Sequence, residues 1–188
     1  RDLPRGVDLD LFSPTRREPD LFARWGLATG PVILYVGRLS REKNLDALFQ
    51  AFRALRSRGV AASLAIVGDG PERPALEMRW SSPDVAFIGY LRGEELATAY
   101  ASADLFVFPS RTDTFGNAVL EAMASGLPPI VASEGGPAEQ VRHGETGLVI
   151  DLGVPDALVD AMAILLARES VRRRLAAAAR QHARSCSW

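Results

Sequence analysis

Short apolar segments alternate with amphipathic helical patterns along most of this chain, and the alternation limits the folds that it can adopt. The run Val-Ile-Leu-Tyr-Val at 32–36 is bounded by Pro and Gly and is typical of a strand buried on both faces. Apolar residues at helical spacing follow over 45–55, and Gly59 is expected to end that helix. Similar runs predict further buried strands at 63–67, 85–88, 105–108, 130–131 and 148–150. The spacing predicts the other helices at about 71–79, 94–102, 116–125, 137–142, 155–167 and 170–184.

Strand–helix alternation over six units indicates the α/β class, with helices on both faces of a parallel sheet. Because crossover connections are right-handed, the expected fold is a Rossmann-like, doubly wound parallel sheet of about six strands. We expect residues 31–188 to form this domain. Residues 1–30 contain three prolines and are interpreted as a linker or lead-in, with a short helix at about 19–25.

Composition and charge exclude several classes of protein. The 188 residues include 22 Lys and Arg against 23 Asp and Glu, and a net charge of −1 argues against binding nucleic acid by bulk charge. A hydrophobic content of 47% supports a sizeable core, but no apolar run reaches the roughly 18–20 residues of a membrane span. The single cysteine, Cys186, excludes an intrachain disulfide and fits a cytoplasmic protein. Together with His143 and His182, it supplies too few scattered ligands for a zinc cluster.

The two ends of the sequence indicate a piece of a longer protein. The chain starts at Arg1 without an initiator Met or a signal peptide, and it ends on Trp188 after a long helical pattern. A large apolar residue in the last position usually packs against another part of a protein. We therefore expect the chain to be an excised part of a longer protein.

In a doubly wound sheet, ligands bind at the carboxyl ends of the strands, and this chain concentrates its glycines there. Any one glycine could simply end a strand, but so many on one edge favour a binding site. The candidate segments on this edge are Gly37-Arg38, Gly68-Asp69-Gly70, Gly89-Tyr90, Pro109–Gly116 and Ser133–Pro137.

Several common catalytic and binding motifs are missing from the sequence. It has no Gly-x4-Gly-Lys-Ser/Thr phosphate loop, and Arg73 takes the third glycine position of a dinucleotide fingerprint that would start at Gly68. There is no Gly-x-Ser-x-Gly motif, and neither His lies beside a nucleophile. Asp8 and Asp10 have the spacing of a metal-binding pair but follow no buried strand, so no metal site is expected.

A basic pair follows the first expected strand. Arg38 comes directly after it, and Lys43 stands five residues later, just before a helix for which Asn44 is a suitable N-cap. Two cations beside a helix N-terminus form a site for a multiply charged anion such as a diphosphate. The alternative is that both side chains belong to the solvated surface.

An acidic pair lies within the segment 112–128. Asp113 is in the loop after a strand, and Glu121 is in the second turn of a helix that opens at Gly116-Asn117. Carboxylates suit sugar hydroxyls, because each can accept two hydrogen bonds with defined geometry. Backbone N–H groups near 115–117 could meet an anion at the same place. Alternatively, Glu121 is an ordinary surface or ion-paired residue.

Gly135 and Gly136 precede the helix expected at 137–142. Paired glycines allow a ligand to approach the backbone closely. The alternative is an ordinary turn between a strand and a helix, and this motif taken by itself favours the turn.

Taken together, these motifs resemble the C-terminal, donor-binding half of a family 4 retaining glycosyltransferase with two Rossmann-like domains, the GT-B architecture. The resemblance covers nearly the whole chain, and the order of the pieces is far more specific than any single piece. The matching pieces are Arg5-Gly6-Val7-Asp8 with Phe12 and Pro14, Val36-Gly37-Arg38 with Lys43-Asn44, Ile66–Pro71, Phe87–Leu91, Asp113–Glu121, Gly135-Gly136 with Glu139, and Gly144–Val149.

The resemblance implies a role for each of these residues. Arg38 and Lys43 would hold the diphosphate of the donor and stabilise the charge that develops as it leaves, without a metal or another cofactor. Glu121 would accept hydrogen bonds from the ribose, and Asp113 would contact the transferred sugar. The residues expected to line the sugar, phosphates or base are Gly37, Gly68, Asp69, Gly70, Tyr90, Leu91, Phe115, Gly116, Asn117, Gly135 and Gly136.

The implied function is the transfer of a hexose, with retention, from a UDP- or GDP-sugar to an acceptor bound by a separate N-terminal domain. The whole protein would be a hexosyltransferase of the EC 2.4 class that meets a membrane only through its acceptor half. The part seen here is expected to bind donor weakly and to transfer nothing by itself. Removing Arg38 and Lys43 should abolish nucleotide binding with little change in melting temperature.

Two positions depart from the pattern of this family. Asp113 stands where the family has Glu and is one methylene shorter, so either the sugar shifts or a water molecule bridges the gap. Pro128-Pro129 stands where the family has Pro-Val, and the second proline is tolerable only as the first residue of a strand.

Two other functions are compatible with the same residues. A sugar-nucleotide epimerase or a phosphorylase would keep this architecture, although Lys43, the only lysine, already has a diphosphate role. A non-catalytic nucleotide-binding or interaction domain would not need Arg38, Lys43 and Glu121, because folding alone requires none of them.

Overall fold

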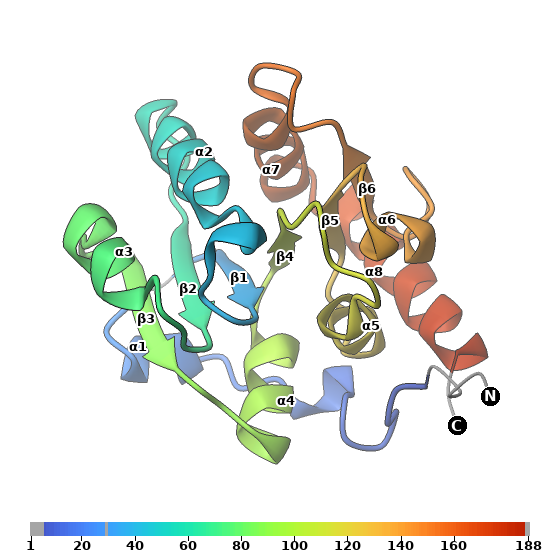
Figure 1. The fold of residues 1–188 in the computed structure, drawn as a ribbon. Helices are drawn as coiled ribbons and strands as arrows, with labels where there is room; N and C mark the ends of the chain where they lie inside the picture. The colour runs from blue at the N-terminus through green and yellow to red at the C-terminus, as the bar shows by residue number, and fades with distance from the viewer. Residues whose placement is uncertain (1–5, 29, 187–188) are drawn as a thin grey trace.

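The computed structural model describes residues 6–28 and 30–186, and these build one six-stranded parallel sheet between two layers of helices (Figure 1). The strand order is β3-β2-β1-β4-β5-β6, the doubly wound order. The chain adds β2 and β3 on one side of β1 and then crosses back to add β4, β5 and β6 on the other side. The strands are β1 (Val32–Val36), β2 (Ser63–Val67), β3 (Val85–Gly89), β4 (Leu105–Phe108), β5 (Pro129–Ala132) and β6 (Leu148–Ile150).

Helices precede β1, connect successive strands and follow β6 at the C-terminal end of the described chain. They are η1 (Pro14–Arg16), α1 (Leu21–Arg24), η2 (Arg41–Lys43), α2 (Leu45–Ser57), α3 (Arg73–Trp80), α4 (Gly93–Ser102), α5 (Asn117–Ala124), α6 (Gly136–Gln140), α7 (Ala157–Ala167) and α8 (Glu169–Ser185). None of the helices in the described residues is long and apolar enough to cross a membrane.

The central strands form the middle of the core because both of their faces are covered. Every residue of β1, β2, β4 and β5 is buried, whereas β3 and β6, at the two edges of the sheet, are partly exposed. The helix α2 packs against α7 over one face, and α4, α5 and α8 pack together over the other (Figure 1). This arrangement explains why the strand sequences are continuous apolar runs without alternation.

The segment before β1 is packed against the domain in the residues that the structure describes. Val7, Phe12 and Phe22 are buried in the main core, and Phe12 contacts the ring of Tyr100 edge-on at 5.8 Å. Arg180 of α8 donates to the backbone carbonyls of Phe12, Leu9 and Ala124. The domain boundary placed at residue 30 stays a prediction, but the residues just before it contribute to the core.

The α/β class and the six-stranded, doubly wound sheet predicted from the sequence are confirmed, and each predicted strand and helix lies within a few residues of its expected place. Pro129 is the first residue of β5, as its missing N–H requires, and Gly59 follows α2 with a φ of +80°. The two short 3-10 helices are additions that the sequence did not indicate. Arg5, which belonged to a predicted motif, and Trp188, which was expected to pack against another part of a protein, lie outside the described residues.

The prediction that the side chain of Asn44 caps α2 is wrong. Asn44 does occupy the position before α2, but its φ of +56° is left-handed and its side chain makes no capping hydrogen bond. The Nδ2 group instead donates to the carbonyl of Pro109 at 3.4 Å. The side chain therefore ties the β1–α2 connection to the end of β4, at the edge where the candidate site lies.

Candidate functional site

A pocket lies at the carboxyl ends of β1, β2 and β3, where the sequence places most of its candidate residues. Its walls are apolar side chains and glycine backbone, and its volume is about 390 Å³. Seven predicted site residues line it together with three apolar neighbours: Val36, Gly37, Arg38, Val67, Gly68, Asp69, Gly70, Tyr90, Leu91 and Leu96.

Close contact between the loops after β1 and β2 explains the glycines of this pocket. A Cβ atom on Gly68 would lie 1.9 Å from the carbonyl oxygen of Gly37, and one on Gly70 would lie 2.3 Å from that of Leu39. Three backbone hydrogen bonds join the two connections: Gly37 N–H donates to the Val67 carbonyl, Leu39 N–H to that of Asp69, and Glu72 N–H to that of Leu39. The glycines are thus required by the packing of the loops, which form the pocket floor as a consequence.

The carboxylate of Asp69 is engaged within its own turn. One oxygen accepts from the backbone N–H of Gly70 at 2.7 Å, and the other accepts from Arg73 at 3.3 Å. Tyr90 is 67% exposed at the pocket, and the guanidinium of Arg92 lies over its ring at 4.9 Å from the centroid. Asp69 therefore shapes the turn, while Tyr90 presents an aromatic surface to solvent.

Lys43 and Asp113, predicted separately, are brought into direct contact. Lys43 Nζ donates to Asp113 Oδ2, and each side chain keeps only about a fifth of its surface exposed, 18% and 20%. The ammonium also lies 5.8 Å from the centre of the Phe108 ring. Phe108 at the end of β4 and Asp113 in the loop after it therefore hold the ammonium group of Lys43 in place.

Arg38 stands on the same β1–α2 connection as Lys43 and lines the pocket with an exposed side chain. The hydroxyl of Tyr35 donates to the Arg38 carbonyl at 3.0 Å, and this hydrogen bond fixes the backbone of Arg38. Burial raises the pKa of the Tyr35 phenol, and the Asp113 and Glu42 carboxylates raise it further. The phenol thus stays protonated as a donor. Arg38 borders the pocket, and Lys43 lies five residues later on the same connection.

Gly135 and Gly136 lie against the loop that carries Asp113 and Phe115. The N–H of Gly136 donates to the Asp113 carbonyl at 2.8 Å, and a Cβ atom on Gly136 would lie 2.1 Å from the oxygen of Thr114. Gln140 of α6 donates to the carbonyl of Phe115. Close packing between the two loops, which neither interpretation included, therefore requires the small size of Gly136, and the binding role of the pair stays a prediction.

The helix α5 starts where predicted and presents Glu121 in its second turn. Gly116, with a φ of +55°, occupies the N-cap position, and Asn117 is the first helical residue. Glu121 accepts a hydrogen bond from the hydroxyl of Tyr100 at 3.0 Å. It also lines a small pocket formed with α5 residues and the N-terminal segment, made up of Gly6, Val7, Asp8, Phe12, Asn117, Leu120 and Glu121.

Burial raises the pKa of Glu121, and the hydrogen bond from Tyr100 lowers it in part. In the unfolded chain the carboxyl group has its ordinary pKa, so the ionised form costs folding free energy once the pH exceeds that value. The interpretation of Glu121 as an ordinary surface residue does not agree with this environment.

Replacing Glu121 with Gln is therefore expected to stabilise the fold near neutral pH. The amide oxygen still accepts from Tyr100, while the buried charge is gone, so the melting temperature should rise by about 1–4 °C. The difference should disappear at acidic pH, below the ordinary carboxyl pKa, where Glu121 is protonated in both the folded and unfolded chains. Thermal unfolding of both proteins from acidic to neutral pH measures this difference in melting temperature. A lower melting temperature for the variant at pH 7 would contradict the prediction.

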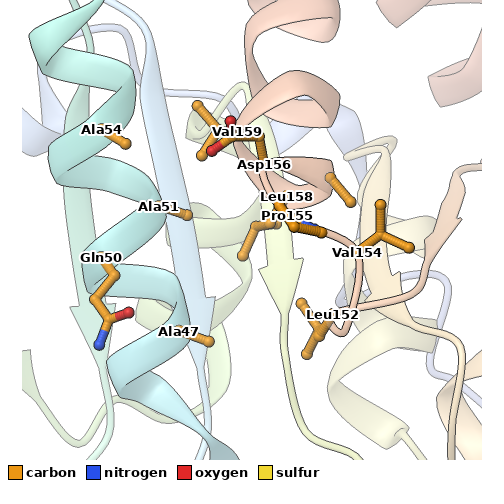
Figure 2. Close-up of a pocket in the computed structure, with 11 residues that line it drawn as sticks. Ala47, Gln50, Ala51, Ala54, Leu152, Val154, Pro155, Asp156, Leu158 and Val159 are labelled. Carbon is orange, nitrogen blue, oxygen red and sulfur yellow. The ribbon is translucent and has the colours of Figure 1, made fainter.

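A hollow between α2 and the segment before α7 lies apart from these residues (Figure 2). Alanines of α2 and the side chains of Leu152, Val154 and Pro155 form most of its wall, and Asp156 there pairs with Arg58 at 3.5 Å. Gln50 is its other polar side chain. Because this hollow contains none of the predicted site residues, we do not assign it to the candidate site.

Sequence reasoning missed several residues of the site. Leu96 and Tyr100 were assigned only to a helix, and Tyr35 only to a strand. A signal for Tyr100 was present, because a tyrosine on the apolar, alanine-rich face of a helix needs an acceptor for its hydroxyl. Within the described part of the chain, no three His, Cys, Asp or Glu side chains are grouped so that they could hold a metal ion.

Comparison with known sequences identifies one family over most of the chain. The family model described as glycosyl transferases group 1 matches residues 18–182. A GDP-mannose-dependent alpha-mannosyltransferase of Mycobacterium tuberculosis is 40% identical over 185 residues, which are 98% of this chain and 46% of that protein. A sulfoquinovosyl transferase of Arabidopsis thaliana is 34% identical over 189 residues, covering 98% of this chain and 36% of that protein. The chain thus spans about half or less of the length of these relatives.

Comparison with solved structures gives the same fold. The C-terminal domain of a group 1 family glycosyl transferase from Francisella tularensis matches with a TM-score of 0.83 at 19% identity, over 96% of this chain and 97% of that one. A sucrose-phosphate synthase from Thermosynechococcus elongatus matches with a TM-score of 0.84 at 30% identity, over 98% of this chain and 48% of that one. The architecture expected from the sequence, the C-terminal domain of a GT-B protein, is confirmed.

Proposed function

This chain belongs to the group 1 glycosyl transferases, and from that membership we propose that it is the donor-binding part of an enzyme that transfers a hexose from a nucleoside diphosphate sugar. The transfer would proceed with retention at the anomeric carbon. The acceptor would be bound by an N-terminal domain outside this sequence. The stretch described here supplies the donor half of the site and is expected to catalyse no transfer alone.

One observation carries the proposal: seven of the predicted donor-site residues line a single pocket at the carboxyl ends of β1, β2 and β3. Apolar walls and exposed glycine backbone suit the flat face of a base, and Arg38 at the edge of the pocket suits the phosphates next to it. Lys43 lies on the same β1–α2 connection, so a nucleoside diphosphate that fills the pocket would extend toward both cations.

In this proposal, Arg38 and Lys43 neutralise the diphosphate and stabilise the charge that accumulates on it as the bond to the sugar breaks. Asp113 already accepts from Lys43, so it would orient the ammonium while its free oxygen accepts from a hydroxyl of the sugar. Because Asp is a short side chain, the sugar would have to approach the loop at 112–116 closely.

Glu121 would accept hydrogen bonds from the ribose hydroxyls. Its side chain is half-buried, and burial raises its pKa, so the ionised carboxylate is a strong acceptor wherever a donor can reach it. The backbone at Phe115, Gly116 and Asn117 would line the space between sugar and phosphates, at the start of α5.

We propose GDP-mannose as the donor, ahead of a UDP-sugar. Support comes from the relatives named as GDP-mannose-dependent mannosyltransferases, which are 40% and 38% identical over 98% of this chain. A metal-independent reaction without another cofactor, a cytoplasmic location and contact with a membrane only through the acceptor half stay predictions.

The proposal is tested by measuring nucleotide binding to this chain with isothermal titration calorimetry. We expect GDP to bind at least about tenfold more tightly than UDP or ADP, because the discriminating contacts are to the base while the diphosphate is common to all three. Equal binding of all three would contradict the choice of GDP. Binding of none of them, at millimolar concentration, would contradict the donor site itself.

A further inference from the structure

We infer that Tyr100 is the positioning residue that orients Glu121 toward the ribose, and that this pair makes the site selective for ribonucleotides over deoxyribonucleotides. The inference rests on the proposed function, because it assigns the ribose to Glu121. It adds a residue that makes no contact with the donor and a property, selection of the sugar of the nucleotide, that the proposed function does not contain.

The first support is the contact between the two side chains. The Tyr100 hydroxyl donates to Glu121 Oε2 at 3.0 Å, and the tyrosine is fully buried in α4. Two neighbouring rings fix the direction of the phenol: Phe12 meets it edge-on at 5.8 Å, and Phe106 lies 5.6 Å away. A tyrosine held this firmly determines which way its partner's carboxylate faces.

The second support is the place of Tyr100 on α4. Leu96 and Tyr100 are four residues apart, so they lie on the same face of the helix, one turn after the other. Leu96 lines the pocket assigned to the base, and Tyr100 holds Glu121. One helix thus joins the base pocket to the carboxylate, and the ribose is the part of a nucleotide that follows the base.

Selectivity follows from the hydrogen-bonding capacity of Glu121. A carboxylate accepts about four hydrogen bonds, and Tyr100 occupies only one of these positions. Ribose hydroxyls would satisfy further positions on a carboxylate that is largely withdrawn from water. A deoxyribose in the same place would shield these positions from water and leave them unpaired, which costs binding free energy.

The test compares GDP with 2′,3′-dideoxy-GDP by calorimetry on the wild-type chain and on Tyr100→Phe. We expect the wild type to prefer GDP by about tenfold or more, the usual effect of hydrogen bonds to a charged group. In Tyr100→Phe the affinity for GDP should fall severalfold while that for the dideoxy nucleotide stays nearly unchanged, so the preference shrinks.

Tyr35→Phe is the matched control, because it also removes one hydrogen bond of 3.0 Å made by a fully buried phenol beside the site. Its bond goes to the Arg38 carbonyl, so any loss should be equal for both nucleotides. Equal losses in Tyr100→Phe would make Tyr100 merely structural and overturn the inference. Wild-type binding of GDP without a preference over the dideoxy form would also overturn it and leave the diphosphate site standing. Failure of the wild type to bind GDP or UDP would refute the proposed function and the inference with it.

Discussion

Changing both Arg38 and Lys43 to Ala is expected to weaken GDP binding by at least about 100-fold, because each removes a charge-assisted contact to the diphosphate. Arg38 borders the pocket and Lys43 lies on the same connection, so both losses fall on the same part of the ligand. Calorimetry with GDP and with guanosine separates a loss of contacts to the diphosphate from a loss of contacts to the base and ribose. The double variant should lose GDP and keep whatever weak affinity guanosine shows.

The control for this variant removes two positive charges away from the site. Arg53 and Arg173 serve, since Arg53 of α2 lies over the ring of Trp80, and Arg173 of α8 is 80% exposed and pairs with Glu169. The Arg53→Ala/Arg173→Ala variant has the same net charge as the test variant. If it weakened GDP binding as much, the effect would be general electrostatic attraction and the assigned contacts would be wrong.

The ion pair between Lys43 and Asp113 changes one expectation drawn from the sequence. Loss of both cations was expected to leave the melting temperature nearly unchanged. Because Lys43→Ala leaves a carboxylate that is only 20% exposed without its partner, we now expect a loss of roughly 1–2 kcal/mol of stability. Adding Asp113→Asn should restore that stability without restoring GDP binding.

The fold was predictable because its signals are local. Each buried strand, such as 32–36 or 63–67, is a short apolar run, and each amphipathic helix follows at the spacing that doubly wound folds need. The pocket was predictable for a related reason. Parallel strands place their carboxyl ends on one edge, so glycines and charges that follow strands in sequence converge in space.

The contacts that define the chemistry were not predictable, because they join side chains that lie far apart in sequence. Lys43 and Asp113 are 70 residues apart, and Tyr100 and Glu121 are 21 apart. Periodicity places Tyr100 on a helix face but does not say which residue of the next helix it meets. The capping role of Asn44 failed similarly, since the distant Pro109 carbonyl offered its side chain a partner outside the helix.

Gly68→Ala is expected to destabilise the domain by roughly 3–5 kcal/mol or to prevent it from folding. Its Cβ atom would lie 1.9 Å from the backbone oxygen of Gly37, and backbone that is hydrogen-bonded at the end of β2 cannot move aside as a flexible side chain could. The φ of +131° adds strain for any residue with a Cβ atom.

Gly59→Ala is the matched control for the Gly68 variant. Gly59 also has a positive φ, +80°, but nothing lies within 4 Å of the Cβ position, so the change should cost only about 1 kcal/mol from backbone strain. Urea denaturation of both variants gives the two free energies of unfolding. Equal losses would mean that backbone conformation alone requires Gly68. A much larger loss for Gly68→Ala would show that the donor pocket depends on the loops after β1 and β2 touching at a point where no side chain fits.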